Sequence, residues 1–75
     1  MSDVSPDAVA WLGRFAALIG APAPSIGEIE TLLNLAGSAA HASHRQAAPV
    51  ACWLAARAGV DPAEALERAR SLDPR

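Results

Sequence analysis

Prolines and glycines divide this chain into four segments, and that division constrains the fold more than any other feature. Pro22 and Pro24 stand in APAPS (residues 21–25) and cannot continue a helix, because proline lacks a backbone N–H and pushes its predecessor toward extended conformations. Gly20 and Gly59 mark helix ends, since glycine readily adopts the left-handed conformation common there. The segments between these breaks predict four helices, over about residues 6–19, 26–44, 48–58 and 62–73.

Three of the predicted helix starts carry capping residues. Ser5 and Asp61 each offer a side-chain oxygen to free amides, and each precedes a proline that suits the first helical position. Ser25 and Glu28 fit a capping box. Pro49 predicts the first position of the third helix. No segment alternates with period two, so the predicted fold is all-α, a compact bundle of four short helices.

Apolar residues recur at helical spacing in the predicted helices. The first helix has one broad apolar face, and in the third helix Val50, Trp53 and Leu54 are expected to point inward. The second helix is apolar almost all round, and Gly37 in its middle suggests that another backbone comes close. The face of the first helix consists of Trp11, Leu12, Phe15, Leu18 and Ile19.

The chain is short, with 75 residues, and we expect residues 1–75 to form a single helical domain. A domain of this size buries only about 60% of the surface that its unfolded chain exposes, so it usually depends on a disulfide, a metal or a partner subunit. Cys52 is the only cysteine, which excludes an internal disulfide and favours a reducing compartment. A metal or a partner is therefore left as the added source of stability.

The charge balance bears on the classes of partner. The chain has six arginines, no lysine and a net charge of −2, whereas a nucleic-acid-binding protein needs a clustered positive face. No apolar run reaches the roughly 18–20 residues of a membrane span. The opening MSDVSPD lacks the positive and apolar regions of a secretory signal. We expect neither a nucleic-acid partner nor a membrane, and a cytoplasmic location.

Two histidines and the cysteine raise the possibility of a metal site or a catalytic thiol. His41 and His44 are three residues apart on the predicted second helix, and Cys52 on the next helix could supply a third ligand. A zinc site typically shows a second close pair of ligands, which this sequence lacks. A catalytic cysteine needs a base and an oxyanion hole, and nothing around Cys52 suggests them. We predict no metal, no cofactor and no catalytic residue.

The polar join between the second and third helices is a candidate binding surface. His41 and Arg45 suit a helix C-terminus, where positive charge complements the helix dipole. Alternatively Arg45, helped by Gln46 and by open amides at the start of the third helix, binds a phosphate or carboxylate. Trp11 and Trp53 are interpreted as core residues or, if partly exposed, as anchors of a protein interface. The candidate partner- or anion-binding residues are His41, His44, Arg45, Gln46, Trp53 and Trp11.

The stretch LLNLAGSAAHASHRQAAPVACWLAARAG (residues 32–59), with Ala40-His41, Arg45 and Ala47-Ala48-Pro49, resembles a small actinobacterial helical domain. That domain occurs alone or fused to the C-terminus of molybdenum-cofactor guanylyltransferase. The family pattern has a proline after the arginine, where this chain has Gln46. The resemblance implies a non-catalytic accessory role near molybdenum-cofactor maturation or a molybdoenzyme, with His41 and Arg45 as functional positions.

These observations lead to three hypotheses. The first is a helical adaptor that docks on a molybdoenzyme or a cofactor-maturation protein. The second is a ligand-binding protein that captures a phosphate or a pterin at the join. The third is a structural homodimer, because self-association would supply the missing stability.

Overall fold

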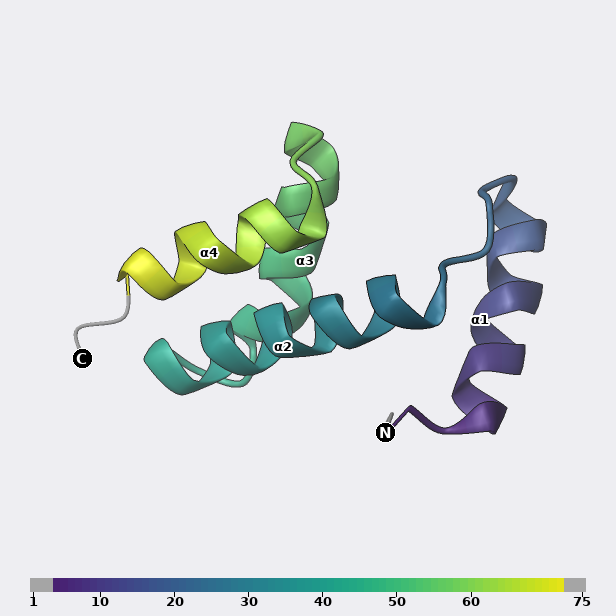
Figure 1. Cartoon of the computed structure of the whole chain (residues 1–75), viewed down its shortest axis with the longest axis horizontal. Coiled ribbons are helices and arrows are strands. Elements are labelled where there is room, and N and C mark those ends of the chain that lie inside the picture. The colour runs from purple at the N-terminus through teal and green to yellow at the C-terminus, as the bar shows by residue number, and fades with distance from the viewer. Residues whose placement is uncertain (1–3, 73–75) are drawn as a thin grey trace. The chain divides into compact units, whose positions relative to one another are not determined.

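The computed structural model describes residues 4–72, and these residues form four α-helices with no strand among them (Figure 1). The predicted all-α class and the number of helices are confirmed. Asp73, to which the last helix was predicted to extend, lies outside the described residues. The helices are α1 (Pro6–Ile19), α2 (Ile26–Ala42), α3 (Ala47–Ala58) and α4 (Pro62–Leu72).

The starts of α1 and α2 are capped by the predicted side chains. Ser5 Oγ accepts hydrogen bonds from the amides of Asp7 at 3.2 Å and Ala8 at 3.4 Å. Ser25 and Glu28 form the capping box in both directions, with Ser25 N donating to Glu28 Oε1 at 2.8 Å and Glu28 N donating to Ser25 Oγ at 3.0 Å. These bonds satisfy amides that have no partner within the helix.

The predicted cap of α4 and the predicted glycine ends are also confirmed. Asp61 Oδ2 accepts a hydrogen bond from the amide of Ala63 at 3.1 Å, and Pro62 occupies the first helical position. Gly20 and Gly59 have φ angles of 77° and 73°, the left-handed conformation that ends α1 and α3. Local chemistry therefore determines most helix ends in this chain.

The chain divides into two compact units, residues Met1–Glu30 and Thr31–Arg75. The first unit contains α1, the proline linker and the start of α2, and its most buried side chains are those of Ala16 and Ile29. The second unit contains the rest of α2 with α3 and α4, and Leu35 and Leu66 are its buried core residues.

Within the second unit, α3 runs across α2 and α4 (Figure 1). It contacts α4, and the Cys52 thiol donates a hydrogen bond of 3.7 Å to the carbonyl oxygen of Leu32 in α2. On α4, Arg68 and Glu64 form an ion pair one turn apart on the exposed surface. The second unit is therefore a three-helix arrangement in which α3 is the central connection.

The expectation that another backbone approaches Gly37 is wrong. A Cβ atom added at Gly37 would meet no atom of another element within 4 Å among the described residues, and the position is exposed. The glycine therefore leaves α2 with a flexible residue that no packing contact requires.

Candidate functional site

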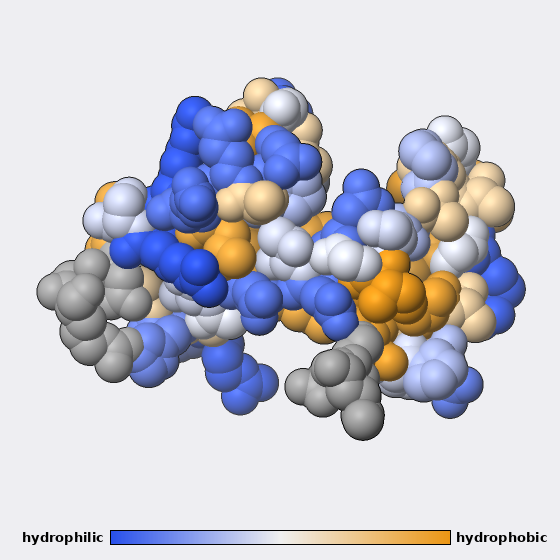
Figure 2. Space-filling model, in the orientation of Figure 1, coloured by the Kyte–Doolittle hydropathy of each residue, from blue (hydrophilic) through white to orange (hydrophobic). Residues whose placement is uncertain are grey.

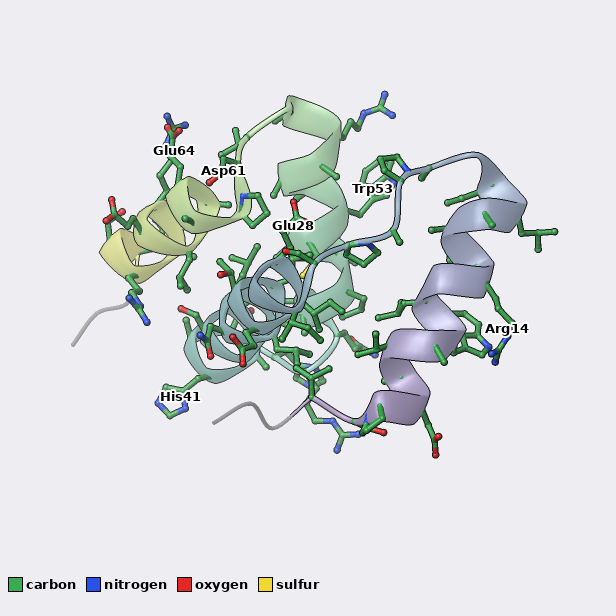
Figure 3. All side chains as sticks on the ribbon, turned by 45° about the vertical axis from the view of Figure 1, so that its right-hand side comes forward. Arg14, Glu28, His41, Trp53, Asp61 and Glu64 are labelled. Atoms are coloured by element: carbon green, nitrogen blue, oxygen red, sulfur yellow. The ribbon has the colours of Figure 1, made fainter. Side chains whose placement is uncertain are left out.

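The join between α2 and α3 places His41 and His44 differently from the prediction. His41 lies in the last turn of α2, but α2 ends at Ala42 and His44 lies outside it. The amide of Ser43 still bonds to the carbonyl of Ala39 at 3.1 Å, after which the chain turns toward α3. The two imidazoles therefore do not share one helix face, and His41 points away from α2 (Figure 3).

The start of α3 also differs by one residue from the prediction. The helix begins at Ala47, with Gln46 at the N-cap in a helical conformation and without a side-chain capping bond. Pro49 consequently occupies the third helical position rather than the first. It is tolerated because the amides of the first turn have no intrahelical acceptor.

Three amides before Pro49 are already bonded and are therefore not open to an anion. Gln46 N donates to Nδ1 of His44 at 3.3 Å. Ala47 N donates to the carbonyl of His44 at 2.8 Å, and Ala48 N to the carbonyl of Arg45 at 3.1 Å. Pro49 has no N–H to offer. The side chains that could contact an anion at the join, those of His41, His44, Arg45 and Gln46, are all exposed.

Cys52 is placed as a structural thiol. Its side chain is half-buried, and burial raises the pKa of the thiol above its ordinary value of 9.0. A raised pKa keeps the sulfur protonated near neutral pH, whereas nucleophiles and metal ligands need the thiolate. Within residues 4–72, no three His, Cys, Asp or Glu side chains are grouped so that they could hold a metal ion.

Trp11 and Trp53 are both more than half exposed, so their interpretation as core residues is wrong. Trp11 is 54% exposed and stacks on Phe15 with 5.1 Å between the ring centroids. These rings line a shallow hollow on α1 together with Arg14 and Leu18.

Trp53 is 57% exposed, and the guanidinium of Arg57 lies over its ring at 5.0 Å from the centroid. In Figure 3 the indole projects from α3 on the side away from α4. The sequence interpretation missed Arg57, although its spacing of four residues from Trp53 is the signal that could have found it.

The expectation that Val50, Trp53 and Leu54 point inward is wrong for all three. They are 53%, 57% and 54% exposed, and with Arg57 they form one face of α3, called the outer face below. The opposite, less exposed face consists of small residues and is called the inner face below. Its members are Ala48, Ala51, Cys52 and Ala55.

Helix α1 also leaves large apolar residues exposed. Four residues of its predicted apolar face, Trp11, Phe15, Leu18 and Ile19, are exposed, and only Leu12 at the edge of this face, next to the buried Ala16, is less exposed. Hydrophobic residues therefore reach the surface instead of being covered by a continuous polar shell, as the face drawn in Figure 2 shows.

Comparison with known proteins identifies the family of the chain. A family model described as a domain of unknown function, DUF6457, matches residues 3–73. No curated protein and no solved structure matches the chain significantly. Among the described residues, no helix is both long and apolar enough to cross a membrane.

Proposed function

The chain belongs to the DUF6457 family, whose function is unknown. From the surface of the chain itself, we propose that this protein is a non-catalytic adaptor that docks on another protein. One observation carries this proposal. Most large apolar side chains of α1 and α3 are exposed, and in α3 only small residues occupy the less exposed face.

The exposed tryptophans are the physical reason for choosing a protein partner. A tryptophan in water leaves a large apolar area uncovered, and burying it against a partner recovers that free energy. Tryptophan and arginine are also enriched among the few residues that dominate the affinity of protein interfaces. The pair formed by Trp53 and Arg57 combines both residue types on one helix.

A non-catalytic role is supported by the chemistry of the described side chains. The half-buried Cys52 is a poor nucleophile at neutral pH, because burial raises the pKa of its thiol. The exposed polar residues of the join lie on a connection between helices rather than in an enclosed site.

For the partner, we propose a molybdoenzyme or a protein of molybdenum-cofactor maturation. The support is the sequence resemblance of residues 32–59 to a domain that occurs fused to molybdenum-cofactor guanylyltransferase. A domain that stands beside an enzyme in one chain is expected to bind a related enzyme when it is a separate protein.

The test is affinity capture of the tagged full chain from its own cells, followed by mass spectrometry. We expect one molybdoenzyme or maturation protein to co-purify in a stable complex. Trp53→Ala should lower its recovery about 30-fold, since truncating an interface anchor costs about 2 kcal/mol or more. Leu72→Ala, which removes an exposed apolar side chain from the end of α4, is the matched control and should leave recovery unchanged. Recovery of chaperones alone would contradict the adaptor.

Direct capture of a phosphate or pterin at the join is the second candidate, and the exposed Arg45 is the observation that favours it. Because the amides of Gln46, Ala47 and Ala48 are already bonded, Arg45 would have to supply most of the binding. Inorganic phosphate at a hundredfold excess over Kd would then stabilise the fold by about 2.7 kcal/mol, and Arg45→Ala would abolish this effect. A thermal unfolding series with and without phosphate distinguishes this candidate from the adaptor.

The third candidate is a homodimer that buries the exposed tryptophans against a second copy. It predicts a sedimentation coefficient that rises with protein concentration in the absence of any other protein. A monomer at all concentrations would exclude it and leave the apolar faces for a different partner.

A further inference from the structure

The outer face of α3 has the spacing of a helix that inserts into a groove. Val50, Trp53, Leu54 and Arg57 stand at positions i, i+3, i+4 and i+7, which bring all four onto one side of the helix. Helices that bind in an apolar groove present their anchor residues at this spacing. All four are exposed in the structure.

The opposite side of α3 shows that this exposure is built into the packing. Cys52 on the inner face bonds to the carbonyl of Leu32, which places this face of α3 next to α2. Trp53 and Leu54 lie on the other side of α3 and are both more than half exposed. The second unit therefore cannot cover the outer face with its own helices without breaking the contacts of the inner face.

Charge identifies the kind of groove that fits this face. Residues 31–60 contain no Asp or Glu, although the whole chain has eight acidic residues and a net charge of −2. The same residues include Arg45 and Arg57, and α3 itself has Arg57 as its sole charged side chain. The outer face is thus apolar with a single positive edge and has no carboxylate of its own.

The position of Arg57 suits it to pair with carboxylates of another molecule. Its guanidinium lies over the Trp53 ring, which holds the charge at the border of the apolar surface. A planar guanidinium can stack on an aromatic ring and still direct its N–H groups at a carboxylate. A partner that covered Trp53 would therefore bring its own side chains within reach of Arg57.

We propose that the outer face of α3 is the docking surface of this chain and that it inserts into an apolar groove bordered by Asp or Glu residues on a different protein. This inference rests on the proposed adaptor function and identifies the surface and the partner chemistry. The apolar side chains supply affinity, and the positive edge supplies orientation and discrimination.

Two other arrangements fit the charges less well. A second copy that paired its α3 with this α3 would offer Arg57 no carboxylate, because α3 contains none. The exposed face of α1 carries both Asp7 and Arg14, so it has no single sign that selects a partner. The outer face of α3, which has no Asp or Glu, is therefore the surface that requires acidic residues in its partner.

The test is site-specific photo-crosslinking in the cells that make the protein. The full chain carries a photoreactive phenylalanine analogue in place of Leu54 on the outer face or, as the control, in place of Ala63 on α4. Both positions are exposed. The crosslinked partner peptide is then identified by mass spectrometry, and circular dichroism confirms that each variant keeps its helical content.

We expect position 54 to crosslink to a partner segment that combines apolar residues with Asp or Glu, and position 63 to give no such product. Arg57→Glu should lower the crosslinking yield at least tenfold, whereas Arg57→Lys, which retains the positive charge, should lower it much less. Raising the salt concentration in a cell extract should weaken the complex, because salt screens the exposed charge pairs.

Other outcomes separate this inference from the adaptor function. Two results would show that the outer face of α3 is not the docking surface while leaving the adaptor function intact. In the first, a partner is captured but crosslinks from position 63 alone; in the second, Arg57→Glu leaves the crosslinking yield unchanged. A product in which position 54 is joined to a second copy of the chain overturns the inference in favour of a dimer. If neither position crosslinks and no protein is captured, the adaptor function fails as well.

Discussion

The inner and outer faces of α3 differ in the size of their side chains. The inner face carries three alanines and Cys52, and the outer face carries Trp53, Leu54 and Val50 with Arg57. In a helix that serves an isolated domain, the large apolar residues are expected on the covered side. The reversed order in α3 gives the small residues to the packing of this chain and leaves the large residues exposed, as the proposed docking requires.

A geometric reason supports this reversal. The distance between two packed helices depends on the side chains at their contact, and small residues allow a close approach. The hydrogen bond from the Cys52 thiol to the Leu32 carbonyl requires that α3 lie near the backbone of α2. An indole ring on the inner face would hold the helices apart and break this contact.

The largest expected difference in the free energy of unfolding is between truncating a buried side chain and truncating one on the outer face of α3. Leu35 is only 3% exposed, so Leu35→Ala should lower the free energy of unfolding by about 3 kcal/mol, through lost burial and a residual cavity. Trp53→Ala removes a larger side chain from the outer face and should cost less than about 1 kcal/mol. Urea unfolding followed by circular dichroism measures both, and equal losses would show that the outer face is part of the core.

Enlarging the inner face is expected to have the next largest effect. Cys52→Leu should destabilise the protein by about 2 kcal/mol, because added volume has to push α3 away from α2. Ala56→Leu adds a leucine at an exposed position of the same helix and should change stability by less than about 0.5 kcal/mol. Thermal unfolding of the two variants gives the comparison, and a Cys52→Leu protein as stable as the wild type would contradict close packing at this position.

A smaller effect of opposite sign is expected at Gly37. The position is exposed, and an added Cβ meets no other element, so Gly37→Ala should stabilise α2 by about 0.5–1 kcal/mol. Ser38→Ala, one residue away, is a useful companion because it tests helix propensity at a less exposed site. A loss of stability in Gly37→Ala would indicate that another backbone does approach α2.

The smallest predicted effect is a pH dependence from the Cys52 thiol. Burial raises its pKa above 9.0, so the folded chain keeps the proton at a pH where the unfolded chain has lost it. The stabilisation is complete below about pH 9 and is lost as the pH rises through the pKa of the folded state. Unfolding at about pH 8 and about pH 10 should show this loss in the wild type and a smaller one in Cys52→Ser. An identical pH dependence in both proteins would remove the thiol as its cause.

Most of the helix ends could be predicted from local sequence, because their chemistry is complete within a few residues. Ser25 and Glu28 bond to each other's amides, and Gly59 supplies the left-handed residue that ends α3. None of these interactions depends on a distant part of the chain. For that reason the predicted starts of α1, α2 and α4 agree with the structure.

The join between α2 and α3 was predicted less well because its residues offer competing bonds. Proline favours the first helical position but is tolerated anywhere in the first turn, so Pro49 alone cannot set the start of α3. The carbonyls of His44 and Arg45 accept the amides of Ala47 and Ala48, and this turn begins the helix earlier. The same bonds occupy the amides of Ala47 and Ala48, so neither is open to an anion.

The sequence by itself determined the helical class, the number of helices and most of their ends, because caps, prolines and glycines act within one turn of the chain. It could not determine which side of α3 is covered, since apolar residues surround that helix and periodicity distinguishes apolar from polar rather than large from small. Only the tertiary structure decided this point. The approach of α3 to α2 selects the face with the least volume for contact, and the tryptophan is left outside.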